Sequence, residues 1–401
     1  MTDELREEAK KMASTDDPLI EAEKAAGFGD LGLEDLDIPI PPDVATSDEV
    51  EDTFDFDTAF RFSFVGVGQG GSRLAESFYK LGYRRVAAIN TTLQDLTAIS
   101  IPDKNKLDIG GGGAGKDPAV AAAAISDKDE DVYDVLKRAW GRSTDYALVC
   151  LGAGGGTGAG ASCKVIEIAR RLMEENGRPV RVGVIVALPK NSEGQKPAKN
   201  ALYTVEQLSA LDVSPAVILD NERIRELYDP VPSKEYPLAN SSIAKYLHLF
   251  NRLGAQDSEH TTFDRADLSK LLDSGVVAFG AQKITSWSNA ADISSAIRQQ
   301  LRKNILASVD LTEGRQAGLL FVMDREVYGQ IKSSTLDHGF EMLSRILGED
   351  SIVYRGVYPG GGAGLTALTM ISELKWPKSR LLELAKIAGV DKQAVENWLG
   401  V

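Results

Sequence analysis

The chain has 401 residues, of which 43% are hydrophobic, so it is long enough for two or three domains with sizeable cores. The first residues, "MTDELREE", are acidic where a secretory signal would be basic and then apolar, and no run of about 18 apolar residues occurs. We therefore expect a cytoplasmic protein without membrane insertion. Its two cysteines, Cys150 and Cys163, have no metal-ligand spacing, which argues against a disulfide framework and a zinc site.

The net charge of −14 is concentrated in the first part of the chain. Residues 1–57 hold 19 acidic and 4 basic residues, whereas residues 58–401 hold 40 acidic and 41 basic residues. The segment has few aromatic residues and a proline cluster, "IPIPPDV", so it cannot bury enough apolar surface to offset the entropy of ordering. We predict an acidic, disordered segment over residues 1–57, either as a solvating arm or as a docking arm for a partner.

Residues 58–222 alternate between apolar runs and amphipathic segments. We expect strands at "FRFSFVGVG", "RVAAIN", "DYALVCLGA", "VRVGVIVALP" and "PAVILDN", with helices between them. The first of these helices is expected at "SRLAESFYKLGY". Because the runs are apolar throughout, both faces of the sheet should be covered, as in a parallel sheet. The predicted fold class is therefore α/β, with a doubly wound parallel-sheet domain over residues 58–222.

The rest of the chain predicts three further parts. Residues 223–256 indicate a proline-containing linker and a long central helix, "SSIAKYLHLFNRLGA". Residues 257–373 indicate a smaller α+β domain with strands at "GVVAFGAQKI", "AGLLFVMD" and "GVYPGGGAGLTALTMIS". Residues 374–401 indicate a tail of two short amphipathic helices. The tail has helix-turn-helix spacing, but residues 372–401 hold five bases and four acids, so contact with a neighbouring protein or an adaptor is favoured over DNA binding.

Three glycine-rich loops follow predicted strands: "GVGQGG", "GGGGAGKD" and "LGAGGGTGAGAS". In an open parallel sheet, ligands bind at the carboxyl ends of the strands. Glycines allow backbone amides to approach phosphate oxygens, and a helix N-terminus adds unpaired N–H groups. The second loop nearly completes a P-loop, but Asp117 stands where Ser or Thr would bind Mg²⁺. One loop alone could serve helix packing; three at one sheet edge predict a phosphate site.

The first loop also fits the dinucleotide fingerprint GxGxxG, which is typical of NAD-dependent oxidoreductases. Such an enzyme needs an acidic residue about 20 positions later to bind the ribose, and Asn90 stands there. None of the three histidines, His248, His260 and His338, is placed as a catalytic acid or base would be. An NAD-dependent oxidoreductase is therefore the weaker alternative.

The run "GGGTGAG", together with "GQGGS" in the first loop, resembles the tubulin/FtsZ superfamily of GTPases, whose signature is GGGTG[ST]G. "AINTT", "GGGGAG", "LPKNSEG", "LDNERI" and "TTFDRADL" resemble further family segments in the same order, over about residues 60–375. In character the chain is similar to plasmid- and phage-encoded bacterial tubulin-like proteins. The resemblance implies GTP and Mg²⁺ as ligands and head-to-tail self-assembly into cytomotive filaments that position DNA or phage particles. A divergent FtsZ-like cell-division protein is the alternative.

The resemblance also implies roles for individual residues. Phosphate contacts would come from Gly68, Gln69, Gly70, Gly71, Gly112, Gly113, Ala114, Gly115, Gly154, Gly155, Gly156, Thr157 and Gly158, with Asn90 beside them. Glu193 would contact the ribose and Asn221 the base, while "PLANSS" has no aromatic ring to stack on guanine.

Asp264 and Asp267 would be catalytic, acting on the nucleotide of the next subunit. From the residues alone, the N-terminal cap of a helix with solvated acids is the favoured interpretation of this pair, and the family resemblance reverses that preference. Four family positions depart from the usual residue: Ser72 and Thr262 replace asparagines, Thr92 replaces an acid, and Pro197 replaces an arginine.

Overall fold

The computed structural model describes residues 57–303, 305–348, 350–360 and 364–399, so nearly all of the predicted acidic segment lies outside the described residues. The strands are β1 (Phe62–Val67), β2 (Val86–Asn90), β3 (Lys106–Asp108), β4 (Tyr146–Gly152), β5 (Val182–Leu188), β6 (Ala216–Asp220), β7 (Val276–Ile284), β8 (Gln316–Met323), β9 (Ile352–Pro359) and β10 (Leu365–Leu374). Within the described residues they form one ten-stranded sheet, in the order β3-β2-β1-β4-β5-β6-β7-β10-β8-β9.

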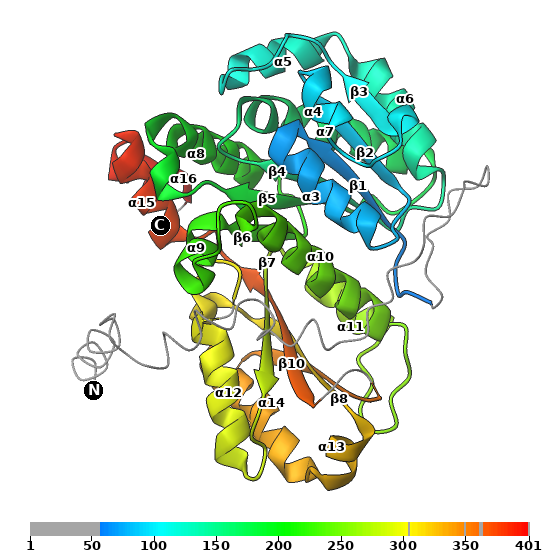
Figure 1. Cartoon of the computed structure of the whole chain (residues 1–401), viewed down its shortest axis with the longest axis vertical. Helices are drawn as coiled ribbons and strands as arrows, with labels where there is room; N and C mark the ends of the chain where they lie inside the picture. Colours follow the sequence, from blue (N-terminus) through cyan, green and yellow to red (C-terminus); the bar gives the residue numbers. More distant parts are fainter. Residues whose placement is uncertain (1–56, 304, 349, 361–363, 400–401) are drawn as a thin grey trace.

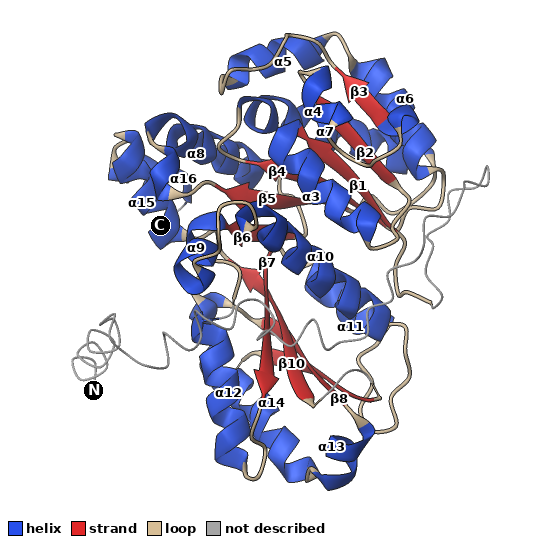
Figure 2. Cartoon of the chain, viewed as in Figure 1, coloured by secondary structure: helices blue, strands red, loops and turns tan. Residues whose placement is uncertain are grey.

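Helices cover both faces of this sheet (Figures 1 and 2). They are α3 (Gly68–Lys80), α4 (Leu93–Thr97), α5 (Pro118–Ser126), α6 (Asp129–Trp140), α7 (Gly156–Glu175), α8 (Gln195–Ala210), α9 (Asn221–Tyr228), α10 (Glu235–Leu253), α11 (Arg265–Leu272), α12 (Ala290–Lys303), α13 (Arg325–Gln330), α14 (Ser333–Leu347), α15 (Lys378–Ala388) and α16 (Lys392–Leu399).

The first seven strands in this order are parallel, which confirms the predicted doubly wound α/β fold. β1 is buried along its whole length, with Val65 and Val67 in the core on one face and Phe62 and Phe64 in the core on the other. The strand is apolar throughout because its side chains are buried on both faces of the sheet. β3 was not predicted, because a three-residue edge strand gives almost no periodic signal.

The neighbours β1 and β4 mark the point where the strand order changes direction. The loop after β1 leads into α3 and the loop after β4 leads into α7, and the two helices pack on opposite faces of the sheet. A crevice opens at the carboxyl ends of strands where the order reverses in this way. The fold therefore places the first and third glycine loops side by side.

The C-terminal half continues the same sheet instead of building a separate one. Ala216 and Val217 of β6 pair in parallel with Val276 and Val277 of β7. β10 lies antiparallel to both β7 and β8, and β8 pairs in parallel with β9. The stretch "GVYPGGGAGLTALTMIS", predicted as one strand, contains the end of β9 and most of β10.

The central helix begins earlier than predicted. α10 starts at Glu235, not at Ser241, and includes Pro237 in its first turn, where the missing N–H of proline interrupts no hydrogen bond within the helix. The prolines that suggested a linker therefore partly belong to the helix start. "LDNERI" contains the start of a separate helix, α9, whose N-terminus is capped by Asp220.

The tail helices α15 and α16 pack on α8 (Figure 1). Leu381 and Leu384 of α15 and Val395 of α16 are fully buried in the core on that face of the sheet. Gly389 adopts a left-handed conformation that ends α15 and allows the turn into α16. The two helices thus bury their apolar faces on the first domain, since a two-helix unit has no core of its own.

Several glycines of "GGGTGAG" and its flanks are required by packing. A Cβ on Gly158 would lie 2.4 Å from the carbonyl oxygen of Gly152, and one on Gly160 would lie 2.0 Å from that of Pro118. These distances are shorter than any allowed van der Waals contact. α7 therefore starts inside the glycine run and lies against the β4 loop and α5 at a distance that only glycine permits.

We predict that Gly160→Ala lowers the free energy of unfolding by about 1–3 kcal/mol, the usual effect of overpacking, because its new methyl group would meet backbone. Gly329→Ala in α13 is the matched control, since nothing lies within 4 Å of its Cβ position. Urea denaturation of both variants measures the difference. Equal stability of the two would contradict the close approach of α7 and α5.

Among the helices of the described residues, none has the length and apolar character needed to cross a lipid bilayer.

Candidate nucleotide-binding site

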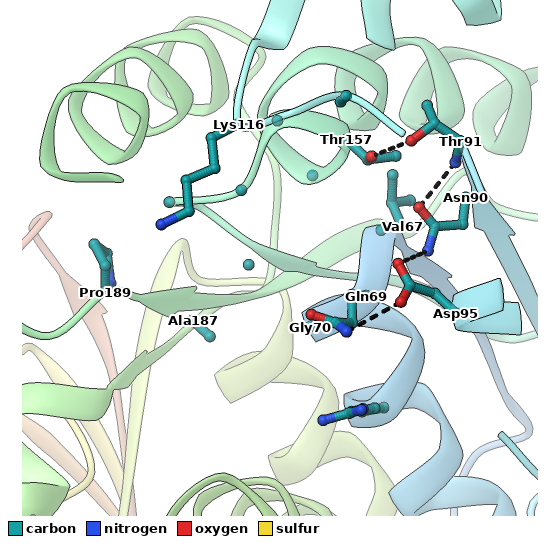
Figure 3. A pocket seen from close by; sticks show the side chains of 18 of the residues that line it. Val67, Gln69, Gly70, Asn90, Thr91, Asp95, Lys116, Thr157, Ala187 and Pro189 are labelled. Carbon is teal, nitrogen blue, oxygen red and sulfur yellow. Dashed lines mark hydrogen bonds between the residues drawn. The ribbon is translucent and has the colours of Figure 1, made fainter. Parts of the chain in front are cut away.

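A pocket of about 470 Å³ opens at the carboxyl ends of the parallel strands, between the loops that follow β1, β2, β4 and β5 (Figure 3). The predicted residues that line it are Gly68, Gln69, Gly70, Asn90, Gly113, Ala114, Gly115, Gly154, Gly155, Gly156, Thr157, Gly158, Glu193 and Asn221. Gly71 and Gly112 do not line it. A Cβ on Gly71 would lie 2.1 Å from the carbonyl oxygen of Cys150, so this glycine allows α3 to pack against β4.

Two helix N-termini face the pocket. Gly68, with a φ of +73°, is the first residue of α3, and Gly156 is the first residue of α7. Neither helix has a side-chain cap, so their first backbone N–H groups have no side-chain acceptor among the described residues. Uncapped amides and the positive ends of two helix dipoles make this part of the pocket suited to an anion with several charged oxygens.

A chain of hydrogen bonds lines one wall (Figure 3). Gln69 Nε2 donates to Asp95 Oδ1 at 3.0 Å, and Asn90 Nδ2 donates to Asp95 Oδ2 at 2.9 Å. Asn90 Oδ1 accepts from the backbone N–H of Thr91, whose hydroxyl is 2.8 Å from the hydroxyl of Thr157. This chain joins the first and third glycine loops and fixes one carboxylate, Asp95, at the edge of the pocket.

The second glycine loop places a cation over the pocket. Lys116 has a φ of +59°, and Figure 3 shows its side chain extending toward Pro189. Asn200 Nδ2 holds the loop by donating to the carbonyl oxygens of Lys116 and Gly154, at 3.0 and 3.2 Å. Lys116 and Arg73, which also lines the pocket, have no ion-pair partner among the described residues. Asp117 instead caps α5, accepting from the backbone N–H of Ala119 at 3.0 Å.

The far end of the pocket combines a ring with two amides. Tyr236 and Asn240 lie one turn apart on α10, and both line the pocket with Asn221. Asn221 and Asn240 are 8% and 9% exposed, and neither side chain has a hydrogen-bond partner among the described residues. Their amide atoms are not among the fully buried polar atoms of the described residues, so they face the pocket and are open to a ligand. A ligand with donors and acceptors at its edge would satisfy them.

Glu193 lies beside this end. Its Oε1 accepts from the backbone N–H of Lys190 at 2.8 Å and from the Tyr236 hydroxyl at 3.4 Å. The ammonium of Lys190 lies 5.1 Å from the centre of the Tyr236 ring and 2.8 Å from Glu235 Oε2. The ring is thus positioned by its neighbours, with one carboxylate oxygen of Glu193 still available.

The structure places Asp264 and Asp267 away from the pocket. They form a capping box at the start of α11: Asp264 Oδ1 accepts from the backbone N–H groups of Ala266 and Asp267, at 2.7 and 2.9 Å, and Asp267 Oδ2 accepts from that of Asp264 at 3.2 Å. The cap anticipated from the residues is therefore present. Burial raises the pKa of the Asp267 carboxyl above its usual value, and the nearby Asp264 charge raises it further.

α10 separates the aspartate pair from the pocket (Figure 1). Tyr236 lies in its first turn, and the segment that leads to α11 follows its last turn. At about 1.5 Å per residue, its 19 residues span about 28 Å. The guanidinium of Arg265, between the two aspartates in sequence, lies 4.4 Å from the ring of Phe60, just before β1. The pair therefore lies at the amino ends of the strands, at the opposite edge of the sheet.

The family model "Tubulin/FtsZ family, GTPase domain" matches residues 61–229. This segment runs from the start of β1 to the end of α9 and includes all three glycine loops, Glu193 and Asn221. Residues 61–229 are therefore similar to the GTPase domain of the Tubulin/FtsZ family. The match removes the support for an NAD-dependent oxidoreductase, because it explains the GxGxxG loop without a dinucleotide.

Two relatives differ in how much of the chain they cover. Cell division protein FtsZ 1 of Pyrococcus woesei is 31% identical over 179 residues, which are 43% of this chain and 45% of the relative. Tubulin-like protein TubZ of Bacillus cereus is 25% identical over 302 residues, 69% of this chain and 65% of the relative. The chain thus spans less than half the length of the FtsZ relative that it matches.

Solved structures extend the likeness beyond the GTPase domain. GDP-form protofilaments of TubZ from Bacillus thuringiensis serovar israelensis give a TM-score of 0.71 at 18% identity, covering 85% of this chain and 93% of that one. CetZ from Methanosaeta thermophila gives a TM-score of 0.65 at 21% identity, and the match covers 84% of this chain and 92% of that one. At these identities the comparison shows the fold, which here includes the C-terminal half.

The pocket residues that were not predicted as ligand contacts from the sequence include Arg73, Thr91, Asp95, Lys116, Tyr236 and Asn240. Tyr236 directly precedes "PLANSS", the segment that was found to lack an aromatic ring, and its spacing of four from Asn240 was the available signal. Thr92 stands where relatives of the resembled family usually have an acidic residue. Asp95, three residues later, places a carboxylate in the pocket near that position.

Proposed function

We propose that the protein binds and hydrolyses GTP and assembles head to tail into filaments, with each active site formed by two subunits. The observation that carries this proposal is the separation of the pocket from the aspartate pair by the length of α10. No conformation of one rigid domain brings the two edges of its own sheet together. Stacking of subunits along the strand direction brings one subunit's aspartates to the next subunit's pocket.

GTP fits the chemistry of the pocket from end to end. The phosphates would lie at the N-termini of α3 and α7, with Lys116 and Arg73 offsetting their charge. Asn221 and Asn240 each offer amide donors and an acceptor, which match the N2 donor and O6 acceptor of guanine. The Tyr236 ring would stack on the base, and the free oxygen of Glu193 would accept from a ribose hydroxyl.

Mg²⁺ also fits the residues present. Asp95, Gln69 and Asn90 provide the hard oxygen ligands that this ion prefers, next to the expected phosphates. The described residues contain no cluster of three His, Cys, Asp or Glu side chains, so the ion would be held largely by phosphate and water. When bound, it would neutralise charge on the phosphates.

Hydrolysis would follow assembly. Asp264 and Asp267 are held in place by their own helix N-terminus and require no nucleotide for their positions. Two carboxylates so placed can orient and polarise a water for attack on the terminal phosphate of the neighbouring subunit. A free subunit lacks this pair at its pocket, which supports a low rate before assembly.

For the biological role, we favour positioning or segregation of DNA or phage particles over cell division. One structural neighbour, with a TM-score of 0.69, is described as the type III plasmid segregation protein TubZ. The match to FtsZ of Pyrococcus woesei covers 43% of the chain, whereas the match to TubZ of Bacillus cereus covers 69%. An adaptor protein or DNA would contact the filament through the tail or through the acidic segment.

Two measurements test the proposal. Titration with GTP, ATP and NAD is expected to give tight binding of GTP only, and light scattering with electron microscopy is expected to show filaments when GTP is added. Binding of NAD without GTP, or GTP hydrolysis that does not depend on protein concentration, would refute the two-subunit site.

We predict that Lys116→Ala weakens GTP binding about tenfold, as expected for the loss of one charge-assisted contact, and weakens GDP binding less. The reason is that Lys116 lines the pocket from the loop that lies against the N-terminus of α7, and it has no ion-pair partner among the described residues. Lys104→Ala, an exposed lysine outside the pocket, is the control. Equal losses for GTP and GDP would argue against contact with the terminal phosphate.

A further inference from the structure

One buried arginine of the tail helix α15 lies behind the residues that line the pocket. Arg380 has a side chain that is 2% exposed, and its Nε donates to Asp220 Oδ1 at 3.1 Å. Nη2 donates to the carbonyl oxygen of Pro189 at 2.6 Å, and Nη1 donates to Asn191 Oδ1 at 2.6 Å and to Glu383 Oε2 at 2.8 Å. The guanidinium therefore joins three segments that are far apart in the sequence.

Two of these segments form the base and ribose end of the pocket. Pro189 lines the pocket, and the segment that follows it leads through Asn191 to Glu193. Asp220 directly precedes Asn221, so Arg380 bonds to one pocket-lining residue, Pro189, and to the residue before another. No atom of Arg380 lines the pocket itself.

Asp220 connects the arginine to the start of α9. Its Oδ1 also accepts from the backbone N–H of Glu222 at 3.2 Å, and its Oδ2 accepts from the Ser308 hydroxyl at 2.8 Å. Glu222 Oε2 in turn accepts from the backbone N–H of Asn191 at 2.9 Å. The two pocket segments are thus bonded to each other and to Arg380, and moving one moves the other.

Arginine suits this position for a geometric reason. Its planar fork presents five donors in fixed directions, so it can bond a carboxylate, an amide oxygen and a carbonyl oxygen at once. A lysine ammonium carries the same charge on one nitrogen and cannot reach three groups placed around a plane. The arrangement therefore does more than neutralise Asp220, because it sets the spacing of two loops.

We propose that Arg380 is a positioning residue of the nucleotide site, through which docking of the tail helix controls how tightly and how selectively the base is held. The inference rests on the proposed function, that this pocket binds GTP. Any partner or subunit contact that lifts α15 from α8 would release the two segments and weaken nucleotide binding. The tail is then a control element for the site, which adds to its role in covering the core.

Arg380→Lys tests this inference. The variant keeps the charge opposite Asp220 and loses the fork, so we expect GTP affinity to fall about tenfold, the scale of one charge-assisted hydrogen bond, with kcat per assembled subunit unchanged. Preference for GTP over ITP, which lacks the 2-amino group, is expected to fall as well, because Asn221 loses its fixed position. Equilibrium nucleotide binding and steady-state hydrolysis measure these effects.

Leu384→Ala separates positioning from stability. Leu384 lies on the same helix and is fully buried. Its apolar side chain makes no hydrogen bond to either pocket segment. This variant is expected to destabilise the fold as much as Arg380→Lys or more, with GTP affinity and GTP-over-ITP preference unchanged. Equal losses of affinity in both variants, at matched stability, would overturn the inference in favour of a purely structural role.

A double variant tests the same inference if Arg380→Lys does not fold. Arg380→Met with Asp220→Asn removes both charges and leaves no unpaired buried ion. It is expected to weaken GTP at least as much as the lysine variant, and near-ultraviolet spectra of Trp376 and Trp398 report whether the tail stays docked. If the wild-type protein binds GTP and the variants bind it equally well, only this inference is contradicted. Wild-type protein that binds no nucleotide contradicts the proposed function as well.

Discussion

Asp267→Ala is expected to reduce GTP hydrolysis by the assembled protein about 10²- to 10⁴-fold, the usual contribution of general acid–base catalysis, while GTP binding stays unchanged. Binding is preserved because Asp267 lies at the edge of the sheet opposite the pocket. Filaments are expected to persist longer, because their nucleotide is no longer hydrolysed. Phosphate release and light scattering, followed on the same sample, measure both effects.

Two controls separate catalysis from helix capping. Asp264→Asn keeps a capping side chain at the start of α11 and removes only the charge, so it is expected to fold normally and to hydrolyse GTP slowly. Asp324→Ala removes a comparable cap, from α13, and is expected to leave hydrolysis per filament unchanged. If Asp267→Ala altered neither assembly nor phosphate release, the aspartates would be caps only.

Mixing two inactive proteins gives the sharpest test of a shared site. Asp267→Ala subunits retain their pockets, and subunits with Gly158→Val retain their aspartates but lose the space beside Gly152. If the subunits co-assemble, contacts that pair an intact pocket with an intact aspartate loop regain activity. Mixed filaments without any recovery of hydrolysis would indicate a site contained within one chain.

Tyr236→Ala is expected to weaken GTP binding about tenfold or more, because stacking of a base on an aromatic ring contributes about 1–3 kcal/mol. The ring lines the pocket at the end where Asn221 and Asn240 lie. Tyr236→Phe keeps the ring and loses the hydroxyl with its 3.4 Å contact to Glu193, so it is expected to bind GTP nearly as the wild type does. Titration with a fluorescent GTP analogue, with competition by GTP, measures the three affinities.

Tyr203→Ala is the matched control, since Tyr203 is a partly exposed tyrosine on α8 that does not line the pocket. It is expected to have no effect on affinity. A tyrosine-to-alanine change at position 236 that left affinity intact, or a phenylalanine that lost as much as alanine, would show that the base does not stack there.

The sequence predicted the parallel half of the fold and most of the pocket because both depend on local patterns. Buried strands leave apolar runs, and phosphate loops need glycine where they meet a helix, so β1, β4 and their loops could be recognised directly. The resemblance then added Glu193 and Asn221, which the structure places at the same pocket. No local pattern could show that Gly71 and Gly158 also serve close packing, since only the folded neighbours reveal the contact.

The residues that sequence reasoning missed depend on contacts between distant segments. Arg380 is 160 residues from Asp220 and 191 from Pro189, so nothing near it in the sequence indicates a pocket. Tyr236 was missed for a different reason, because the prolines around it suggested a linker when one of them lies in the first turn of α10. A proline in a sequence can indicate either the first turn of a helix or the end of one, and the sequence alone does not distinguish the two.

The opposite placement of the pocket and the aspartate pair on one subunit has a consequence for the filament as a whole. Stacked as proposed, the subunits leave one filament end with an open pocket and the other with an exposed aspartate pair. The subunit with the open pocket has no neighbour to supply carboxylates, so it keeps its GTP for as long as it remains last. The two ends therefore differ chemically, and growth, shrinkage and transport by the filament acquire a direction from the geometry of a single chain.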